Sequence, residues 1–101
     1  EEAKNAANIG CDIVSTTLSG YTKESIEFNK KAGKNPEEPD YELLTAIVES
    51  VKCPVILEGR IWEPSQAAKA FEIGAFSVVI GSAITRPHEI TKRFIKKGLK
   101  V

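Results

Sequence analysis

The sequence has no excess of either charge, no long hydrophobic run and very few residues suited to metal binding. Its 101 residues contain 14 Lys and Arg against 14 Asp and Glu, so the formal net charge is zero. A balanced charge gives no general attraction to nucleic acid or to an anionic membrane surface. No apolar run approaches bilayer length and no signal-peptide pattern is evident, so we expect a cytoplasmic protein that binds neither nucleic acid nor membrane.

Cysteine and histidine are too sparse for a metal centre. Cys11 and Cys53 each lie at the edge of an apolar segment, without a second Cys or His at metal-ligand spacing. We interpret both as small buried residues in a reducing compartment rather than as a disulfide or a zinc site. The only histidine, His88, follows Pro87, and we expect it at the surface.

The chain also lacks an initiating methionine. Residues 1–10 begin within a predicted helix, in which Ala3, Ala6 and Ala7 recur at helical spacing and Gly10 suits the C-terminal cap. We therefore expect the chain to be a piece of a longer protein.

Helices and apolar strands alternate along the rest of the chain. Strands are predicted at 11–17, 55–58 and 75–80, and helices at 41–51, 64–74 and from Pro87 onward. Asp40 is the expected N-cap of the second helix, and Pro64 fits the first turn of the third. Residues 23–39 show no clean helical stripe and contain a Pro-punctuated charged loop, which predicts a flap or a surface excursion.

An internal repeat supports this assignment. Residues 7–14 and 71–78 share an Ile-Gly at the end of a helix and a Val in the following strand. Alternating helices and nearly continuous apolar strands predict an α/β fold with a parallel sheet. Three parallel strands leave two edges unpaired, so residues 1–101 are predicted to be the C-terminal portion, the last three β/α units, of a (β/α)8 barrel.

Two strand-end loops of this sheet have the features of a phosphate site. Gly59 follows the middle strand, and Gly81 and Ser82 follow the last one, where barrel enzymes often bind phosphate. Arg86, at the start of the last helix, is a candidate to bind the same anion. The alternative is that the glycines only permit tight turns and that Arg86 is solvated.

Glu58 is a carboxylate at the end of a buried strand, Val55–Leu57. A charge in that position is costly unless it is paired or functional, so Glu58 is the candidate catalytic residue. Its structural alternative is an ion pair with Arg60, which would share its face if the strand continued.

The first strand-end loop is rich in side chains that can bind a polyhydroxylated ligand. Its hydroxyl groups belong to Thr16, Thr17, Ser19 and Tyr21. Thr in a strand and Ser-Gly in a turn are also common without a function. Trp62 is predicted either to cover the site or to pack against a neighbouring helix or subunit.

Three stretches, Gly10–Thr22, Pro54–Arg60 and Val78–Thr91, together resemble the C-terminal half of N-acetylmannosamine-6-phosphate 2-epimerases. They contain the motifs TTLSGYT, EGR and VVIGSAITRP in the family's order. The resemblance covers nearly the whole chain and is weakest over residues 23–39.

The resemblance implies a barrel that interconverts the 6-phosphates of N-acetylmannosamine and N-acetylglucosamine in sialic acid catabolism. It implies removal and return of the C2 proton without a metal or organic cofactor. Glu58 matches the family's catalytic glutamate, and Gly59, Gly81, Ser82 and Arg86 match its phosphate loops. Arg60, Thr17 and Ser19 are expected at the substrate.

The family's catalytic lysine lies before the first residue of this chain, and no lysine present follows a predicted strand. We therefore expect negligible activity from this chain without the N-terminal half of the barrel. Exposed sheet edges also predict a homo-oligomer. Two alternatives stay open: another phosphate-binding barrel enzyme, and a non-catalytic module for phospho-ligand binding or assembly.

Overall fold

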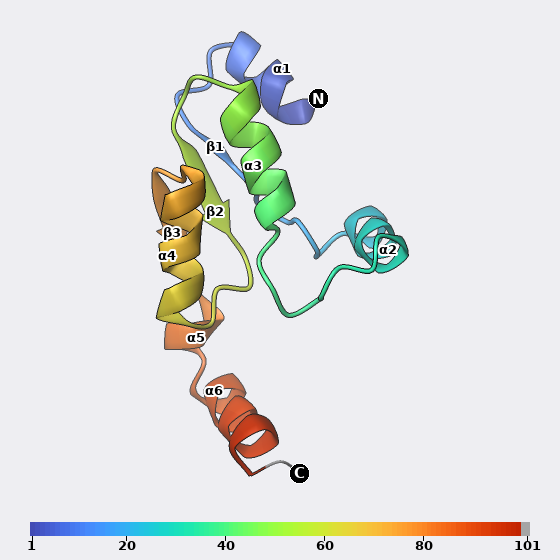
Figure 1. The fold of residues 1–101 in the computed structure, drawn as a ribbon, viewed down its shortest axis with the longest axis vertical. Coiled ribbons are helices and arrows are strands. Elements are labelled where there is room, and N and C mark those ends of the chain that lie inside the picture. The colour runs from blue at the N-terminus through green and yellow to red at the C-terminus, as the bar shows by residue number, and fades with distance from the viewer. Residues whose placement is uncertain (100–101) are drawn as a thin grey trace.

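The computed structural model describes residues 1–99 and contains one parallel three-stranded sheet. Its strands are β1 (Val14–Ser15), β2 (Val55–Glu58) and β3 (Ser77–Val79), in the order β1-β2-β3 (Figure 1). All neighbouring strands run parallel, which confirms the predicted α/β sheet. β1 is shorter than the predicted 11–17, because only Val14 and Ser15 are in register with β2.

The three helices predicted before the strands are present. They are α1 (Glu2–Asn8), α3 (Tyr41–Ser50) and α4 (Pro64–Ile73). Asp40 caps α3 by accepting a hydrogen bond from the Leu43 N–H, at 3.1 Å. α4 begins at Pro64 and ends at Gly74, whose φ of 121° lies in the region that favours glycine. These ends confirm the predicted boundaries.

Two helices were not predicted from the sequence: a four-residue helix at Ser82–Thr85, in an expected loop, and a longer one after β1. α2 (Lys23–Lys31) lies inside the segment that was interpreted as a flap or a surface excursion. It begins at a capping box, in which the Ser25 N–H donates to Thr22 Oγ1 at 3.1 Å and Ser25 Oγ accepts from the Thr22 N–H at 3.2 Å. The cap therefore outweighs the weak helical periodicity that the prediction relied on.

The C-terminal helices extend along the long axis of the molecule, away from the sheet (Figure 1). They are α5 (Ser82–Thr85), α6 (Pro87–Arg93) and a π-helical turn η1 (Phe94–Gly98). The described chain measures 48 × 27 × 21 Å. Phe94 of η1 is 74% exposed, so residues 1–99 leave most of its side chain uncovered. None of the helices in this range is long and apolar enough to cross a membrane.

The core lies on one face of the sheet. α3 and α4 pack there, and Leu44 of α3 and Leu57 of β2 are fully buried. Side chains alternate along a strand, so Ile13 and Val79 lie on the opposite face, where they are 49% and 44% exposed. No helix of the described chain covers this second face (Figure 1).

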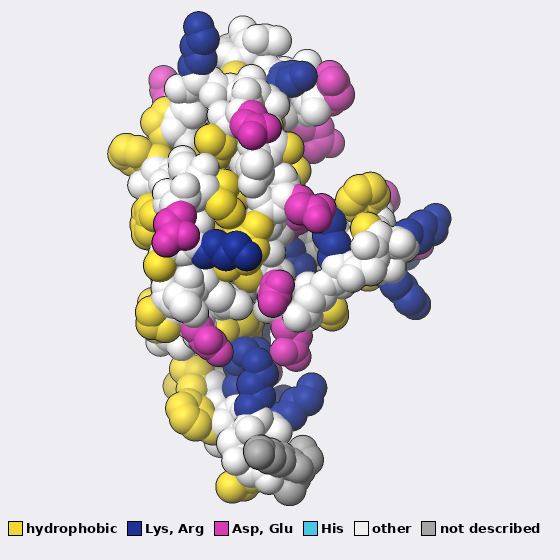
Figure 2. Space-filling model, viewed as in Figure 1, with side chains coloured by type: hydrophobic (Ala, Val, Ile, Leu, Met, Phe, Trp, Pro, Cys, Tyr) yellow, Lys and Arg dark blue, Asp and Glu magenta, His cyan; other side chains and the backbone are white. Residues whose placement is uncertain are grey.

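Further hydrophobic side chains are exposed at the outer edge of the sheet. Figure 2 shows them along the left side of the molecule, over α4 and the segments that follow it. Phe71, Phe76 and Ile84 are 50%, 69% and 72% exposed. This edge therefore offers apolar surface that residues 1–99 leave uncovered.

The interpretation of the two cysteines as buried residues is wrong for Cys11 and holds in part for Cys53. Cys11 is exposed, whereas Cys53 is partly buried and packs against the core, and both thiols are free. β1 begins only at Val14, so Cys11 lies outside the strand that was expected to bury it. His88 is exposed, as predicted, and its Nε2 lies 2.8 Å from a Glu89 carboxylate oxygen.

Candidate active site

A cavity of about 290 Å³ lies at the carboxyl ends of the strands. Its lining comes from all three strand-end segments. After β1 these residues are Leu18 and Tyr21, at the end of β2 they are Glu58 to Trp62, and at the end of β3 they are Val79 and Gly81 to Ala83. The structure thus brings together five of the predicted site residues, namely Glu58, Gly59, Arg60, Gly81 and Ser82. Thr17, Ser19 and Arg86 do not line the cavity.

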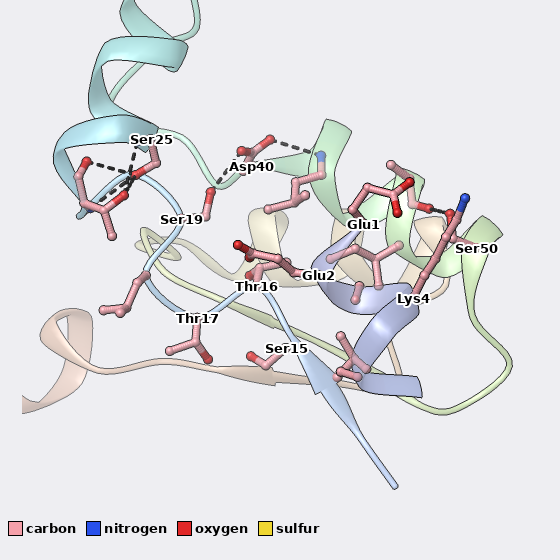
Figure 3. A pocket seen from close by; sticks show the side chains of 18 of the residues that line it. Glu1, Glu2, Lys4, Ser15, Thr16, Thr17, Ser19, Ser25, Asp40 and Ser50 are labelled. Carbon is pink, nitrogen blue, oxygen red and sulfur yellow. Dashed lines mark hydrogen bonds between the residues drawn. The ribbon is translucent and has the colours of Figure 1, made fainter. Parts of the chain in front are cut away.

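The Glu58 carboxylate is held by hydroxyl groups of the neighbouring strand segment. Thr17 Oγ1 donates to Glu58 Oε2 at 2.7 Å, and Ser15 Oγ donates to the same oxygen at 3.4 Å. Ser15 and Thr17 lie on the same side of the β1 segment (Figure 3). Ser15 was not identified from the sequence, although its spacing from Thr17 predicts a shared face.

Thr16 fixes the backbone on the opposite side of the same segment. Its hydroxyl donates to the Glu58 carbonyl and accepts from the Glu58 N–H, both at 3.0 Å, and Thr16 is only 3% exposed. The two strand ends are therefore joined beyond the last regular pair of the sheet.

The alternative of an ion pair between Glu58 and Arg60 is wrong. The strand ends at Glu58, and Arg60 has a φ of 61°, which turns its side chain out of the strand's alternation. Its guanidinium lies against Gly20, where an added Cβ would come within 2.8 Å of the Arg60 Cζ. Among residues 1–99 Arg60 forms no salt bridge, and its buried Nε has no hydrogen-bond partner.

The cavity wall contains unusual backbone conformations. Leu18 and Arg60, with φ of 66° and 61°, are the non-glycine residues with positive φ in the described chain, and both line the cavity. Each such residue costs about 1–3 kcal/mol, and such strain concentrates at functional sites. Gly59 also lines the cavity and has a φ of 106°, and a Cβ added there would come within 3.4 Å of the Tyr21 ring.

Gly81, Ser82 and Ala83 of the loop after β3 line this cavity. The Gly81 carbonyl accepts from the N–H groups of Ile84 and Thr85, at 3.0 and 3.1 Å, whereas the N–H groups of Ser82 and Ala83, at the start of the short α5, have no acceptor within the helix. Arg86 separates α5 from α6 and is exposed. Arg86 does not line the cavity, so it can contact a bound phosphate, as predicted, only if the ligand extends out of the cavity towards the start of α6.

Ser19 is held by a second network. Its hydroxyl donates to Asp40 Oδ2 at 3.0 Å, while Asp40 Oδ1 accepts from Lys34 Nζ at 3.1 Å (Figure 3 shows Ser19 turned towards Asp40). Burial raises the pKa of Asp40, but the Leu43 N–H, Lys34 and Ser19 outweigh it and hold the pKa below its usual value. The sequence identified Asp40 only as a helix cap.

Trp62 at the rim of the cavity packs against the last helix. The Arg93 guanidinium lies 4.0 Å from the centre of the Trp62 ring. This contact agrees with the predicted packing against a helix rather than with a cover over the site.

A larger groove of about 1020 Å³ runs along the free edge of β1, between α1, α2 and α3 (Figure 3). Glu2, Lys4, Ser15 and Ser50 are among the residues that line it. It lies on the side of β1 that has no neighbouring strand, because β1 is the first strand of the sheet order.

These features define a class of protein. A parallel sheet with a carboxylate and glycine loops at its carboxyl edge is typical of α/β proteins that bind ligands outside the strand ends. Comparison with known proteins gives the family. The model of the family described as "Putative N-acetylmannosamine-6-phosphate epimerase" matches residues 1–100, and the chain belongs to this family.

Curated relatives and a solved structure agree with this assignment. Relatives named "Putative N-acetylmannosamine-6-phosphate 2-epimerase" are 53% identical in Caldanaerobacter subterraneus and 47% in Malacoplasma penetrans, over 94% and 95% of this chain. The N-acetylmannosamine-6-phosphate 2-epimerase structure from Clostridium perfringens matches with a TM-score of 0.82 and 49% identity, over 95% of this chain and 38% of that one.

The chain is much shorter than these relatives. It spans 37% of the Caldanaerobacter protein and 39% of the Malacoplasma protein. Its sheet of three strands is correspondingly a part of the fold of the Clostridium structure that it matches.

Proposed function

We propose that this chain forms the last three β/α units of a (β/α)8 barrel that interconverts N-acetylmannosamine 6-phosphate and N-acetylglucosamine 6-phosphate. The observation that carries the proposal is the position of Glu58, which the Thr17 hydroxyl holds at the carboxyl edge of the sheet. Glu58 lines the same cavity as Gly59, Gly81 and Ser82. A carboxylate and phosphate-type loops therefore face one ligand-sized space.

The open surfaces of the sheet support completion by further strands. β1 and β3 are the outer strands of the described sheet, so each has an edge with unpaired backbone groups. The groove of about 1020 Å³ follows the β1 edge, and the uncovered face carries Ile13 and Val79. An N-terminal half of the barrel would pair with these edges and bury this face.

In the proposed site, the phosphate binds between the β2 and β3 loops. Gly59, Gly81 and Ser82 contribute backbone N–H groups, and Arg86 contributes a guanidinium from the start of α6. Ser19 and Arg60 are proposed to contact or support the sugar, and Thr17 supports Glu58. Glu58 then faces C2, where one proton is removed and one is returned, without a metal or organic cofactor.

The chain without its barrel partner is proposed to be inactive. The C2 proton is weakly acidic, so its removal needs a base and a group that stabilises the developing negative charge. The lysine that the family uses beside the glutamate is not among the residues of this chain. We also propose that the complete protein is a homo-oligomer, since exposed apolar side chains on its helices, such as Phe71 of α4 and Ile84 of α5, favour association.

The test uses a chimera in which this chain replaces the matching segment of the Clostridium perfringens relative. In D2O, the chimera is expected to form N-acetylglucosamine 6-phosphate with deuterium at C2. The Glu58→Gln chimera should be at least about 100-fold slower, as expected for loss of an acid–base group. The chain alone should incorporate no deuterium.

Four results would contradict the proposal. Deuterium incorporation by the chain alone would show that no second half is needed. Full activity of the Glu58→Gln chimera would remove Glu58 from the chemistry. Faster turnover of other sugar phosphates by the chimera would favour a different phosphate-binding barrel enzyme, and saturable binding without turnover would favour a binding module.

A further inference from the structure

We infer that Thr17 is a positioning residue for Glu58, which deepens and rests on the proposed function. The Thr17 hydroxyl lies 2.7 Å from Glu58 Oε2, a short distance typical of a hydroxyl that donates to a carboxylate. Ser15 reaches the same oxygen only at 3.4 Å. Thr17 is therefore the stronger of the two partners, and it fixes the orientation of the carboxyl plane.

This contact divides the two carboxylate oxygens of Glu58 between two tasks. Oε2 accepts the hydrogen bonds from Thr17 and Ser15. Oε1 accepts no hydrogen bond within residues 1–99, so its lone pairs are available to a ligand. Because the carboxylate plane is fixed, a ligand meets one defined free oxygen, Oε1, instead of two oxygens that exchange places by rotation.

The same contact limits what Thr17 does with a substrate. A hydroxyl group has one proton to donate, and Thr17 donates it to Glu58. Its remaining capacity is to accept a hydrogen bond. Thr17 consequently acts on the reaction through Glu58, which differs from a primary role in binding the sugar.

The surrounding backbone makes this geometry rigid. Thr16 bonds both the N–H and the carbonyl of Glu58, so the two strand ends cannot slide past one another. Threonine is β-branched, and its χ1 angle is therefore more restricted than that of serine. A hydroxyl on a stiff side chain and a locked backbone is suited to hold a catalytic carboxylate in place.

The test compares three variants in the chimera. Thr17→Val keeps the shape and removes the hydroxyl, Thr17→Ser keeps the hydroxyl, and Thr45→Val is the matched control. Thr45 lies in α3, and its hydroxyl donates to the Tyr41 carbonyl at 2.8 Å, remote from the cavity lining.

Loss of a hydrogen bond to a charged group predicts a kcat about 10- to 100-fold lower in Thr17→Val, with KM changed less than about threefold. Thr17→Ser should recover most of kcat, and Thr45→Val should keep it. A rise in KM at unchanged kcat would instead assign Thr17 to substrate binding. An equal fall in kcat for Thr45→Val would mean a general effect on folding.

A readout without substrate separates this inference from the proposed function. The carboxyl carbon-13 signal of Glu58, assigned through Glu58→Gln, is expected to move in Thr17→Val but not in Thr17→Ser or Thr45→Val. An unmoved signal in Thr17→Val would overturn the positioning role. If the chimera turns over no N-acetylmannosamine 6-phosphate while the signal moves as expected, the proposed function fails and the contact stands.

Discussion

Replacement of Asp40 provides a quantitative test of the network that holds the loop after β1. Asp40 Oδ1 accepts from the Leu43 N–H and from Lys34 Nζ, and Oδ2 accepts from Ser19. The Asp40 side chain is only 8% exposed. Loss of the helix cap costs about 1 kcal/mol, and loss of the hydrogen bonds to a charged group costs about 1.5–3 kcal/mol. Asp40→Ala should therefore lower the free energy of unfolding by about 2.5–4 kcal/mol.

Two further variants separate the contribution of the Asp40 charge from that of the helix cap and from that of an exposed ion pair. Asp40→Asn keeps an oxygen for the cap and removes the charge, so it should cost about 1–2 kcal/mol. Glu42→Gln is the control, because Glu42 also binds Lys34, at 3.0 Å, but is 80% exposed. Exposed ion pairs contribute about 0.2–1 kcal/mol, so this variant should lie at or below that range.

The assay is urea unfolding of the chimera followed by circular dichroism. The order of the losses should be Asp40→Ala, then Asp40→Asn, then Glu42→Gln. Equal losses for Asp40→Asn and Glu42→Gln would refute the argument from burial. A loss below about 0.5 kcal/mol for Asp40→Ala would mean that Asp40 does not stabilise the contacts between Ser19, Lys34 and the start of α3.

The same carboxylate predicts a pH dependence. The pKa of Asp40 in the folded chain lies below its ordinary value of 3.8. Its contribution to stability is therefore fully present above the unfolded pKa and is lost as pH falls through the folded one. Below about pH 4, the unfolding free energy of Asp40→Asn should depend less on pH than that of the unchanged chimera. A parallel dependence would assign the acid sensitivity to other carboxylates.

Two other predictions concern the cavity wall and the core. Gly20→Ala places a Cβ within 2.8 Å of the Arg60 guanidinium at a φ of 84°, so it should cost about 1–2 kcal/mol, measured by thermal unfolding. Adding Arg60→Ala should relieve part of this loss, and strictly additive losses would exclude the contact. Leu57→Ala should cost about 2–5 kcal/mol because Leu57 is fully buried, whereas Phe76→Ala, at a side chain 69% exposed, should cost much less in urea unfolding. Similar losses for both would contradict the assigned core.

Local signals in the sequence predicted most of the fold. The cap at Asp40, Pro64 at the start of α4 and Gly74 at its end act over a few residues, so their effects are legible in the sequence. The order of parallel strands followed from the alternation of helices and apolar strands. α2 was missed because its capping box, at Thr22 and Ser25, precedes a segment with weak periodicity.

The candidate site was predicted in part. Glu58 ends β2, Gly59 follows it, and Gly81 and Ser82 come after β3; parallel strands bring their carboxyl ends to one edge. The turn of Arg60 away from Glu58 was not predictable, because an arginine with positive φ violates its local preference. Only the surrounding packing stabilises such a conformation.

The sequence by itself determined the family, the parallel α/β sheet and the strand-end position of Glu58, since these depend on motifs, periodicity and chain order. Tertiary structure decided which groups touch. Thr17 meets Glu58 across 41 residues of sequence, and Ser19 meets Asp40 across 21. Contacts of this kind depend on strand register and on the turns between strands, and no local propensity encodes either. The hydroxyl that orients the carboxylate therefore became visible only when the strands were placed side by side.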